Sequence, residues 1–456
     1  MKTHVTDRLP RTTIAHAAAR LRDRTLSSVD LVAESLQAIA AFDADTHAFI
    51  RVDAREAQEA ARRADIELAA GHDRGPLHGI PISLKDLIDV AGQPTTAASR
   101  VLADLVAATD APIVTRLRDA GVVLIGKTNL HEFALGTTSE DSAYGAVRHP
   151  WDLTRSAGGS SGGSAVAVAT GMGLASIGTD TGGSIRIPSA CCGIVGLKPG
   201  HGEVSTAGVV PLSISLDHVG PLALTVQDAR WLWDALRGVR PGSERGEIPA
   251  AGLRLRRVNG YFSVMSPDVR AAFDAGLAAL HAAGATIDTG TIDGTDAITK
   301  TYSDIVLPEG ARWHGRYLDT RGSSYMPAVR ARLASGRDIS AVDYLNAREM
   351  QPQLRRSVDA ALYGVDAIVL PTLPITAPTI GSADAVPGLD APKLTVRAAM
   401  LRNTQLFNLT GHPAVSLPLR AAPLPVGLQI VGWFGETARL LEIAAACEKI
   451  VCPPLE

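Results

Sequence analysis

The chain has 456 residues, of which 46% are hydrophobic and 20% are charged, and this composition is typical of a globular protein. Its formal net charge is −3 at pH 7 with both signs interspersed, which disfavours nucleic acid as a partner because nucleic-acid-binding surfaces are strongly basic. No apolar run reaches the roughly 18 residues that a membrane span needs, and no signal-peptide pattern opens the chain. We therefore expect a cytoplasmic protein without a membrane partner.

The N-terminal part, residues 1–70, is predicted to be helical. Ser27, with Asp30 three residues later, is a helix-start pattern, and apolar residues then recur at intervals of three and four. A second helix of the same periodicity is expected after Asp53.

Two strands are predicted next, with a helix over 111–120 between them. Residues 79–90, GIPISLKDLIDV, alternate apolar side chains as a strand does and contain Lys85 at the end of the alternation. Residues 121–127, GVVLIGK, have the apolar character of a buried strand.

The segment 158–199 contains two glycine-flanked serines, Ser160 and Ser184, which are 24 residues apart. A helix of small residues is predicted over 165–170 and strands over 174–177 and 193–197, so both serines are expected on loops. Glycines allow positive φ angles and let backbone N–H groups converge where a negative charge develops. This arrangement suits acyl-transfer chemistry.

The rest of the chain continues an alternation of strands and helices. The predicted elements are a strand over 253–258, a helix over 269–280, strands over 367–370, 414–417 and 427–431, and a helix over 440–447. The pattern predicts an α/β fold, one large domain with a mixed sheet of many strands covered by helices on both faces. Within this single domain, 1–456, we distinguish N-terminal helices (1–70), a core (75–235) and a remainder of sheet, helices and pocket segments (250–456).

Several other patterns have weaker support. Residues 121–128 satisfy the phosphate-loop pattern GxxxxGK(S/T), but the intervening residues are β-branched and apolar and belong to a strand rather than a turn. HEFAL at His131 lacks the second histidine of a zinc-protease helix, so we expect His131 on the surface or at a helix cap. A histidine-based hydrolase stays open, although no GxSxG elbow supports it.

Neither a metal nor a cofactor is predicted. No cluster of His, Cys and Glu has ligand spacing, and the cysteines fit neither a zinc site nor a disulfide framework. We expect reduced, structural thiols at Cys191, Cys192, Cys447 and Cys452.

Residues 158–163 taken alone are equally compatible with a flexible linker. Their continuation argues for a site, because a second glycine-rich serine follows one helix and one strand later and a lysine at a strand end precedes both. GGSSGGS, GTDTGGSIRIPSACCGIVGLKP and the upstream GIPISLKD resemble the amidase signature family of serine hydrolases. The resemblance extends over most of the chain, through LPVGLQIVG near Pro425.

The resemblance implies a Ser-Ser-Lys triad in which Ser184 is the nucleophile, Ser160 a relay and Lys85 the general base. It also implies a cis peptide bond between Gly159 and Ser160. A lysine accepts a proton only when it is neutral, so burial must lower its pKa. The outcome is amide cleavage through an acyl-enzyme.

Two further sets of residues are assigned around this triad. The expected oxyanion-hole donors are the backbone N–H groups of Thr181, Gly182, Gly183 and Ser184. The residues expected to brace the two loops by hydrogen bonds are Ser161, Asp180 and Arg186. Each of the bracing residues, taken alone, is equally compatible with an ordinary polar loop residue.

The substrate is expected to be a neutral, partly apolar amide, or an ester, carbamate or urethane with the same electrophilic carbon. In tRNA amidotransferases of the family a Tyr, an Arg and an Asp hold glutamine; Tyr317 matches the Tyr, but the other two fall near Gln351 and Leu401. Tyr317 and Gln351 are tentative substrate-binding residues. Residues 310–326 and 372–388 are expected to be irregular and to form pocket walls, although surface loops without substrate contact are as compatible.

Three functions therefore follow from the sequence. The preferred one is a stand-alone amidase, monomer or homodimer, acting on a small molecule. The alternatives are a glutaminase-type amidotransferase subunit that works with partner chains and a non-catalytic binding scaffold. The presence of Lys85 and both serines disfavours the scaffold.

Overall fold

The computed structural model describes residues 12–242, 246–388, 393–419 and 423–452. The strands in these ranges are β1 (Phe49–Val52), β2 (Pro81–Lys85), β3 (Val123–Thr128), β4 (Ala175–Asp180), β5 (Val195–Lys198), β6 (His218–Ala223), β7 (Arg254–Val258), β8 (Thr286–Gly290), β9 (Ala367–Pro371), β10 (Asp384–Ala385), β11 (Leu394–Thr395), β12 (Ala414–Leu419) and β13 (Val426–Val431). The α-helices are α1 (Ile14–Arg22), α2 (Ser28–Thr46), α3 (Ala54–Ala69), α4 (Pro112–Asp119), α5 (Gly162–Ala169), α6 (Arg186–Cys192), α7 (Val226–Arg237), α8 (Pro267–Ala282), α9 (Ile298–Thr320), α10 (Pro327–Ser335), α11 (Ala341–Leu362), α12 (Val396–Leu401), α13 (Gln405–Leu409) and α14 (Thr437–Val451). The 3-10 helices are η1 (Arg100–Leu102), η2 (Glu132–Ala134), η3 (Gly260–Ser263), η4 (Thr295–Ala297) and η5 (Gly322–Ser324).

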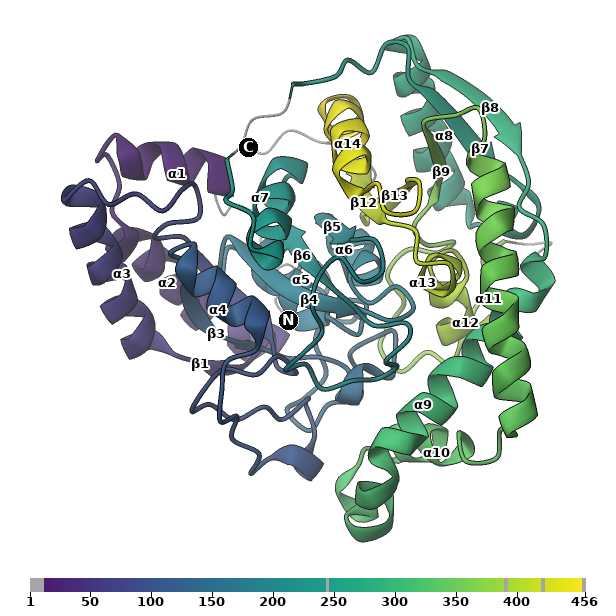
Figure 1. Ribbon diagram of the computed structural model, residues 1–456, viewed down its shortest axis with the longest axis horizontal. Coiled ribbons are helices and arrows are strands. Elements are labelled where there is room, and N and C mark those ends of the chain that lie inside the picture. The colour runs from purple at the N-terminus through teal and green to yellow at the C-terminus, as the bar shows by residue number, and fades with distance from the viewer. Residues whose placement is uncertain (1–11, 243–245, 389–392, 420–422, 453–456) are drawn as a thin grey trace.

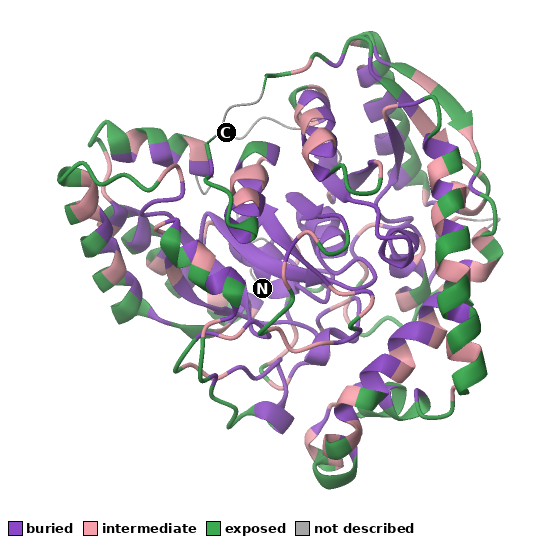
Figure 2. Cartoon of the chain, in the orientation of Figure 1, coloured by how far each residue is buried: buried purple, intermediate pink, exposed green. Residues whose placement is uncertain are grey.

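One 11-stranded mixed sheet runs through the molecule in the order β1-β3-β2-β4-β6-β5-β12-β13-β9-β7-β8. Helices flank it, with α1 to α3 and α9 to α11 on opposite sides of the molecule (Figure 1). The single-domain α/β fold expected from the sequence is confirmed. Every residue of β4, β6, β12 and β13 is buried, so the core lies along the middle of the sheet (Figure 2).

Sheet topology brings the chemistry-bearing residues together. Strand β2 is parallel to β4, with Leu84 opposite Ile177. Carboxyl ends of parallel strands lie at the same edge of a sheet. Lys85, the last residue of β2, therefore lies beside Thr179 and Asp180 at the end of β4.

Local sequence signals account for the N-terminal elements. The side chain of Ser27 accepts a hydrogen bond from Asp30 N at 3.0 Å, and Asp30 accepts one from Ser27 N at 3.1 Å, which completes the predicted capping box of α2. Helix α3 follows Asp53 as expected.

The rejected phosphate-loop pattern is strand β3 in the structure. Its lysine, Lys127, is buried and lies 2.9 Å from Asp86 Oδ1. The β-branched residues thus form a sheet ladder, as expected.

One expectation about the substrate-side segments is wrong. Residues 310–320, expected to be irregular, lie within the 23-residue helix α9, and Pro308 is inside that helix. The chain also contains helices that periodicity did not indicate, α6 among them. In the described ranges, no helix is both long and apolar enough to cross a bilayer.

Candidate active site

The predicted base and relay are in contact. Lys85 Nζ lies 2.8 Å from Ser160 Oγ and 2.9 Å from Thr179 Oγ1, and the Lys85 residue is fully buried. Burial lowers the pKa of Lys85 to about 7, and the charges of Asp180 and Asp217 limit the decrease. Near neutral pH a large fraction of this amine is therefore uncharged and able to accept a proton.

Two other lysines of the described ranges are buried, but neither has a hydrogen bond to a serine hydroxyl there. Lys127 is paired with Asp86, and Lys198 Nζ donates to Pro199 O at 3.0 Å. Of the three, Lys85 alone has its amine against Ser160.

The Ser160 loop is held by main-chain and side-chain contacts. The Gly159–Ser160 peptide bond is cis, as the resemblance implies. Ser160 O accepts hydrogen bonds from His131 N at 3.1 Å and from Ser139 Oγ at 3.2 Å. A Cβ at Gly159 would lie 2.8 Å from Ser139 N, so only glycine fits beside this serine.

Ser161 joins the two serine loops. Its backbone N–H donates to Ser184 O at 3.2 Å, and its hydroxyl donates to Thr179 O at 3.2 Å. Ser184 is 5% exposed, and in the described structure its hydroxyl has no hydrogen-bond partner. The predicted nucleophile is therefore next to the Ser160 loop and has a free hydroxyl.

The loop over 181–184 is buried, and its backbone N–H groups are without acceptors in the described structure. Among the described residues, no acceptor engages the backbone N–H of Thr181, Gly182, Gly183 or Ser184. Gly183 has φ +137°, a conformation that favours glycine, and Thr404 Oγ1 donates to Gly182 O at 2.5 Å. Four consecutive free donors fit the predicted oxyanion hole.

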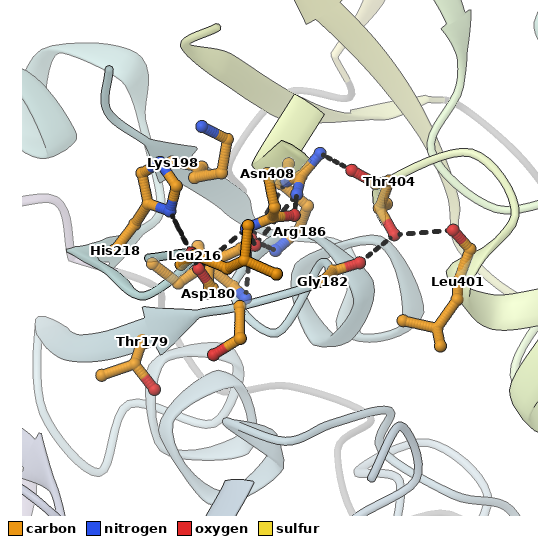
Figure 3. A network of polar contacts seen from close by, with 12 residues as sticks. Thr179, Asp180, Gly182, Arg186, Lys198, Leu216, His218, Leu401, Thr404 and Asn408 are labelled. Carbon is orange, nitrogen blue, oxygen red and sulfur yellow. Dashed lines mark hydrogen bonds and ion pairs between the residues drawn. The ribbon is translucent and has the colours of Figure 1, made fainter. Parts of the chain in front are cut away.

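Asp180 and Arg186 form a fully buried ion pair under this loop (Figure 3). Arg186 donates to Asp180 through Nη2 at 2.9 Å and through Nε at 3.0 Å. Although burial alone would raise it, the Arg186 guanidinium holds the pKa of Asp180 well below its usual range. Asp180 Oδ2 also accepts from Ile185 N at 3.2 Å, which fixes the loop relative to β4.

Three more residues complete the hydrogen bonding of Arg186. Its remaining acceptors are Thr404 O at 3.0 Å, Gln429 Oε1 at 2.7 Å and Asn408 Oδ1 at 2.7 Å. Gln429 lies in the quoted motif LPVGLQIVG, so its segment carried a signal. No sequence motif pointed to Thr404 or Asn408.

The remaining predicted residues have mixed placements. Tyr317 Oη accepts from Arg316 Nη2 at 2.7 Å, and Gln351 Nε2 donates to Leu409 O at 2.9 Å. Their substrate-binding roles stay predictions. His131 is at the N-cap position of η2, as one of the two expectations had it, and it is buried rather than on the surface, with Nε2 3.3 Å from Asp141 Oδ2.

Comparison with known proteins identifies the family. The family model Amidase matches residues 30–441. The chain belongs to the amidase family. A solved structure described as an amidase superposes with a TM-score of 0.91 at 37% identity, covering 96% of this chain and 100% of the other.

Two relatives in the amidase family have amidotransferase names. A glutamyl-tRNA(Gln) amidotransferase subunit from Symbiobacterium thermophilum is 36% identical over 93% of this chain and 94% of its own length. The structure of the subunit of the same name from Thermotoga maritima has a TM-score of 0.78 at 31% identity, covering 98% of this chain and 96% of the other.

Proposed function

We propose that this amidase-family chain hydrolyses an amide through an acyl-enzyme on Ser184. The observation that carries the proposal is the position of Lys85, a buried amine with a pKa near 7 whose nitrogen lies 2.8 Å from Ser160 Oγ. A base with a pKa near the working pH is the most effective proton acceptor at neutral pH.

The proposed first step moves one proton along the triad. As Ser184 Oγ bonds to the carbonyl carbon, its proton passes to Ser160 Oγ, and the proton of Ser160 passes to the neutral amine of Lys85. The carbonyl oxygen becomes an oxyanion and is stabilised by the free N–H groups of the loop over 181–184.

The second half reverses the proton path. Lys85 returns its proton through Ser160 to the leaving nitrogen, the C–N bond breaks, and an acyl ester stays on Ser184. Water then attacks the ester, gives its proton to the relay, and releases a carboxylic acid as the proton returns to Ser184.

A substitution of the nucleophile tests this mechanism. Ser184→Ala is expected to lower kcat by more than about a thousandfold on every substrate of a panel of primary amides, anilides, esters and carbamates. The panel includes the neutral amides, esters and carbamates that the sequence predicts as substrates. The free energy of unfolding should stay within about 0.5 kcal/mol of the parent, because a loop hydroxyl without a partner contributes little to stability.

Ser189→Ala is the matched control. Ser189 is buried in α6, and in the described structure its hydroxyl also has no hydrogen-bond partner. Parent-like turnover in the control together with inactivity of Ser184→Ala supports the proposal. Parent-like turnover in Ser184→Ala would rule out the proposed nucleophile.

A glutaminase-type amidotransferase subunit is the second candidate. Relatives at 36% identity over 93% of this chain carry an amidotransferase name, which favours it. The structure with the higher TM-score, 0.91 against 0.78, is described only as an amidase, so the comparisons favour the amidotransferase subunit over the preferred small-molecule amidase. Glutamine hydrolysis that appears only in the presence of companion subunits would select the amidotransferase.

A further inference from the structure

The side chain of Thr404 holds the backbone of the loop over 181–184. Thr404 is buried between α12 and α13, and its Oγ1 donates to Gly182 O at 2.5 Å (Figure 3). The same oxygen lies 3.3 Å from Leu401 O, so the shorter contact takes its single proton. A Cβ at Gly183 would lie 2.3 Å from Thr404 Oγ1, so the threonine packs closely against both glycines.

The hydrogen bond at Gly182 O also fixes the direction of the next N–H group. In the described ranges the one cis peptide bond is Gly159–Ser160, so the Gly182–Gly183 bond is trans. The C=O and N–H groups of a planar trans peptide point in opposite directions. The N–H of Gly183 therefore points away from Thr404, and no acceptor in the described structure engages it.

The peptide between Gly182 and Gly183 depends on this side chain. The following peptide is held by the main chain, because Gly183 O accepts from Ile187 N at 2.7 Å in the first turn of α6. Among the described residues, no main-chain group donates to Gly182 O. A peptide flanked by two glycines rotates easily, since neither residue has a Cβ to restrict it.

Thr404 is itself anchored to the buried ion pair that braces the loop. Thr404 O accepts from Arg186 Nη1 at 3.0 Å, and Arg186 Nη2 donates to Asp180 at 2.9 Å. Thr404 N donates to Leu401 O at 3.1 Å. The hydroxyl is thus held in one position against Gly182.

We propose that Thr404 is a positioning residue whose hydroxyl directs the N–H of Gly183 at the oxyanion formed during amide cleavage. This inference rests on the proposed function. The oxyanion develops only as the acyl carbon is attacked, so a misdirected donor lowers kcat and leaves substrate binding nearly unchanged.

Variants of Thr404 test the inference. Thr404→Val and Thr404→Ala remove the hydroxyl, and Val keeps the shape of the side chain. With the best substrate of the amide, anilide, ester and carbamate panel, we expect kcat to fall by about tenfold to a hundredfold and KM to change by less than about threefold. Thr404→Ser keeps a hydroxyl and should retain kcat to within about threefold. An equal loss in Thr404→Ser, or a loss mainly through KM, would assign Thr404 a structural role and contradict the inference.

Thr170→Val is the matched control. Thr170 is buried, and its Oγ1 also donates to a backbone carbonyl, Val166 O, at 2.7 Å. It follows the last residue of α5, about 12 Å along the helix from the end that adjoins Ser160. Parent-like kcat in this control together with the loss in Thr404→Val supports the inference, and an equal loss in both would contradict it.

Binding of phenylboronic acid separates this inference from the proposed function. A boronic acid forms a tetrahedral adduct with a serine hydroxyl and so mimics the transition state, and calorimetry measures its Kd without any amide turnover. The Kd is expected to rise at least about tenfold in Thr404→Val and to stay parent-like in Thr404→Ser. Parent-like affinity in Thr404→Val, with affinity lost in Ser184→Ala, would overturn the inference alone. Parent-like affinity and turnover in Ser184→Ala would contradict the proposed function.

Discussion

At the residue scale, the cost of keeping Lys85 uncharged explains its environment. A lysine whose pKa falls from 10.5 to about 7 destabilises the folded state, because the unfolded chain binds a proton that the folded chain releases. The hydrogen bonds to Ser160 and Thr179 offset part of this loss. Residues that serve catalysis often lower stability in this way.

Lys85→Met should therefore remove activity and stabilise the fold. We expect a gain of roughly 1 kcal/mol or more in the free energy of unfolding at pH 6, measured by urea denaturation, because an apolar side chain replaces a buried ionisable group. A variant that is inactive and also clearly less stable than the parent at pH 6 would contradict the lowered pKa, because it would show that the fold stabilises the charged form of Lys85.

The pH dependence of this difference has a definite sign. Between the folded pKa of about 7 and the unfolded value of 10.5, the unfolded chain binds the extra proton, so the stability of the parent rises with pH in this window. The difference in free energy of unfolding between Lys85→Met and the parent is expected to be largest below pH 7 and to decrease toward pH 10.5. A difference that is constant from pH 6 to 10 would contradict the lowered pKa of Lys85.

At the scale of elements, the Asp180–Arg186 pair joins β4 to α6 and, through Asn408 and Gln429, to α13 and β13. Arg186→Met leaves the Asp180 carboxylate buried without its partner. We expect a loss of about 3–5 kcal/mol in the free energy of unfolding, measured by urea denaturation. A loss below about 1 kcal/mol would contradict a structural role for the pair.

Arg337→Met is the control for this experiment. Its ion pair with Asp319 is exposed, so its removal should change stability by no more than about 1 kcal/mol.

Apolar side chains were sufficient to predict β2, β3, β12 and β13, through alternation in β2 and as a continuous apolar run in β3. Strand β4 was predicted to end at residue 177, because the polar residues Thr179 and Asp180 concealed the end of the strand. Helix α6 was missed because it contains Pro188, which is tolerated in a first turn where no N–H bond is needed. Pro308 similarly obscured α9.

At the scale of the whole molecule, the site is assembled from parts of the chain that are far apart in sequence. Arg186 donates hydrogen bonds to Thr404 and Gln429, which follow it by 218 and 243 positions in the sequence. Tyr302, on α9, lies against Gly182. The motifs predicted the triad because those residues lie in glycine-rich segments of distinctive spacing. Tyr302 has no such local pattern, and only the folded chain brings its hydroxyl against Gly182.

The stand-alone function makes a prediction about the whole chain. Purified without companion proteins, it is expected to hydrolyse a simple amide, and added amidotransferase partner subunits should change its kcat/KM by less than about twofold. Size-exclusion chromatography with an activity assay on the fractions checks this. Activity confined to fractions that contain a second kind of chain would favour the amidotransferase.

The most direct measurement of the central claim is the pH dependence of covalent labelling by a sulfonyl fluoride, with the adduct located by mass spectrometry. The account predicts an adduct on Ser184 whose formation rate rises with pH around a midpoint near 7 and is lost in Lys85→Met. An adduct on another residue, or a rate that is flat from pH 5 to 10, would contradict it.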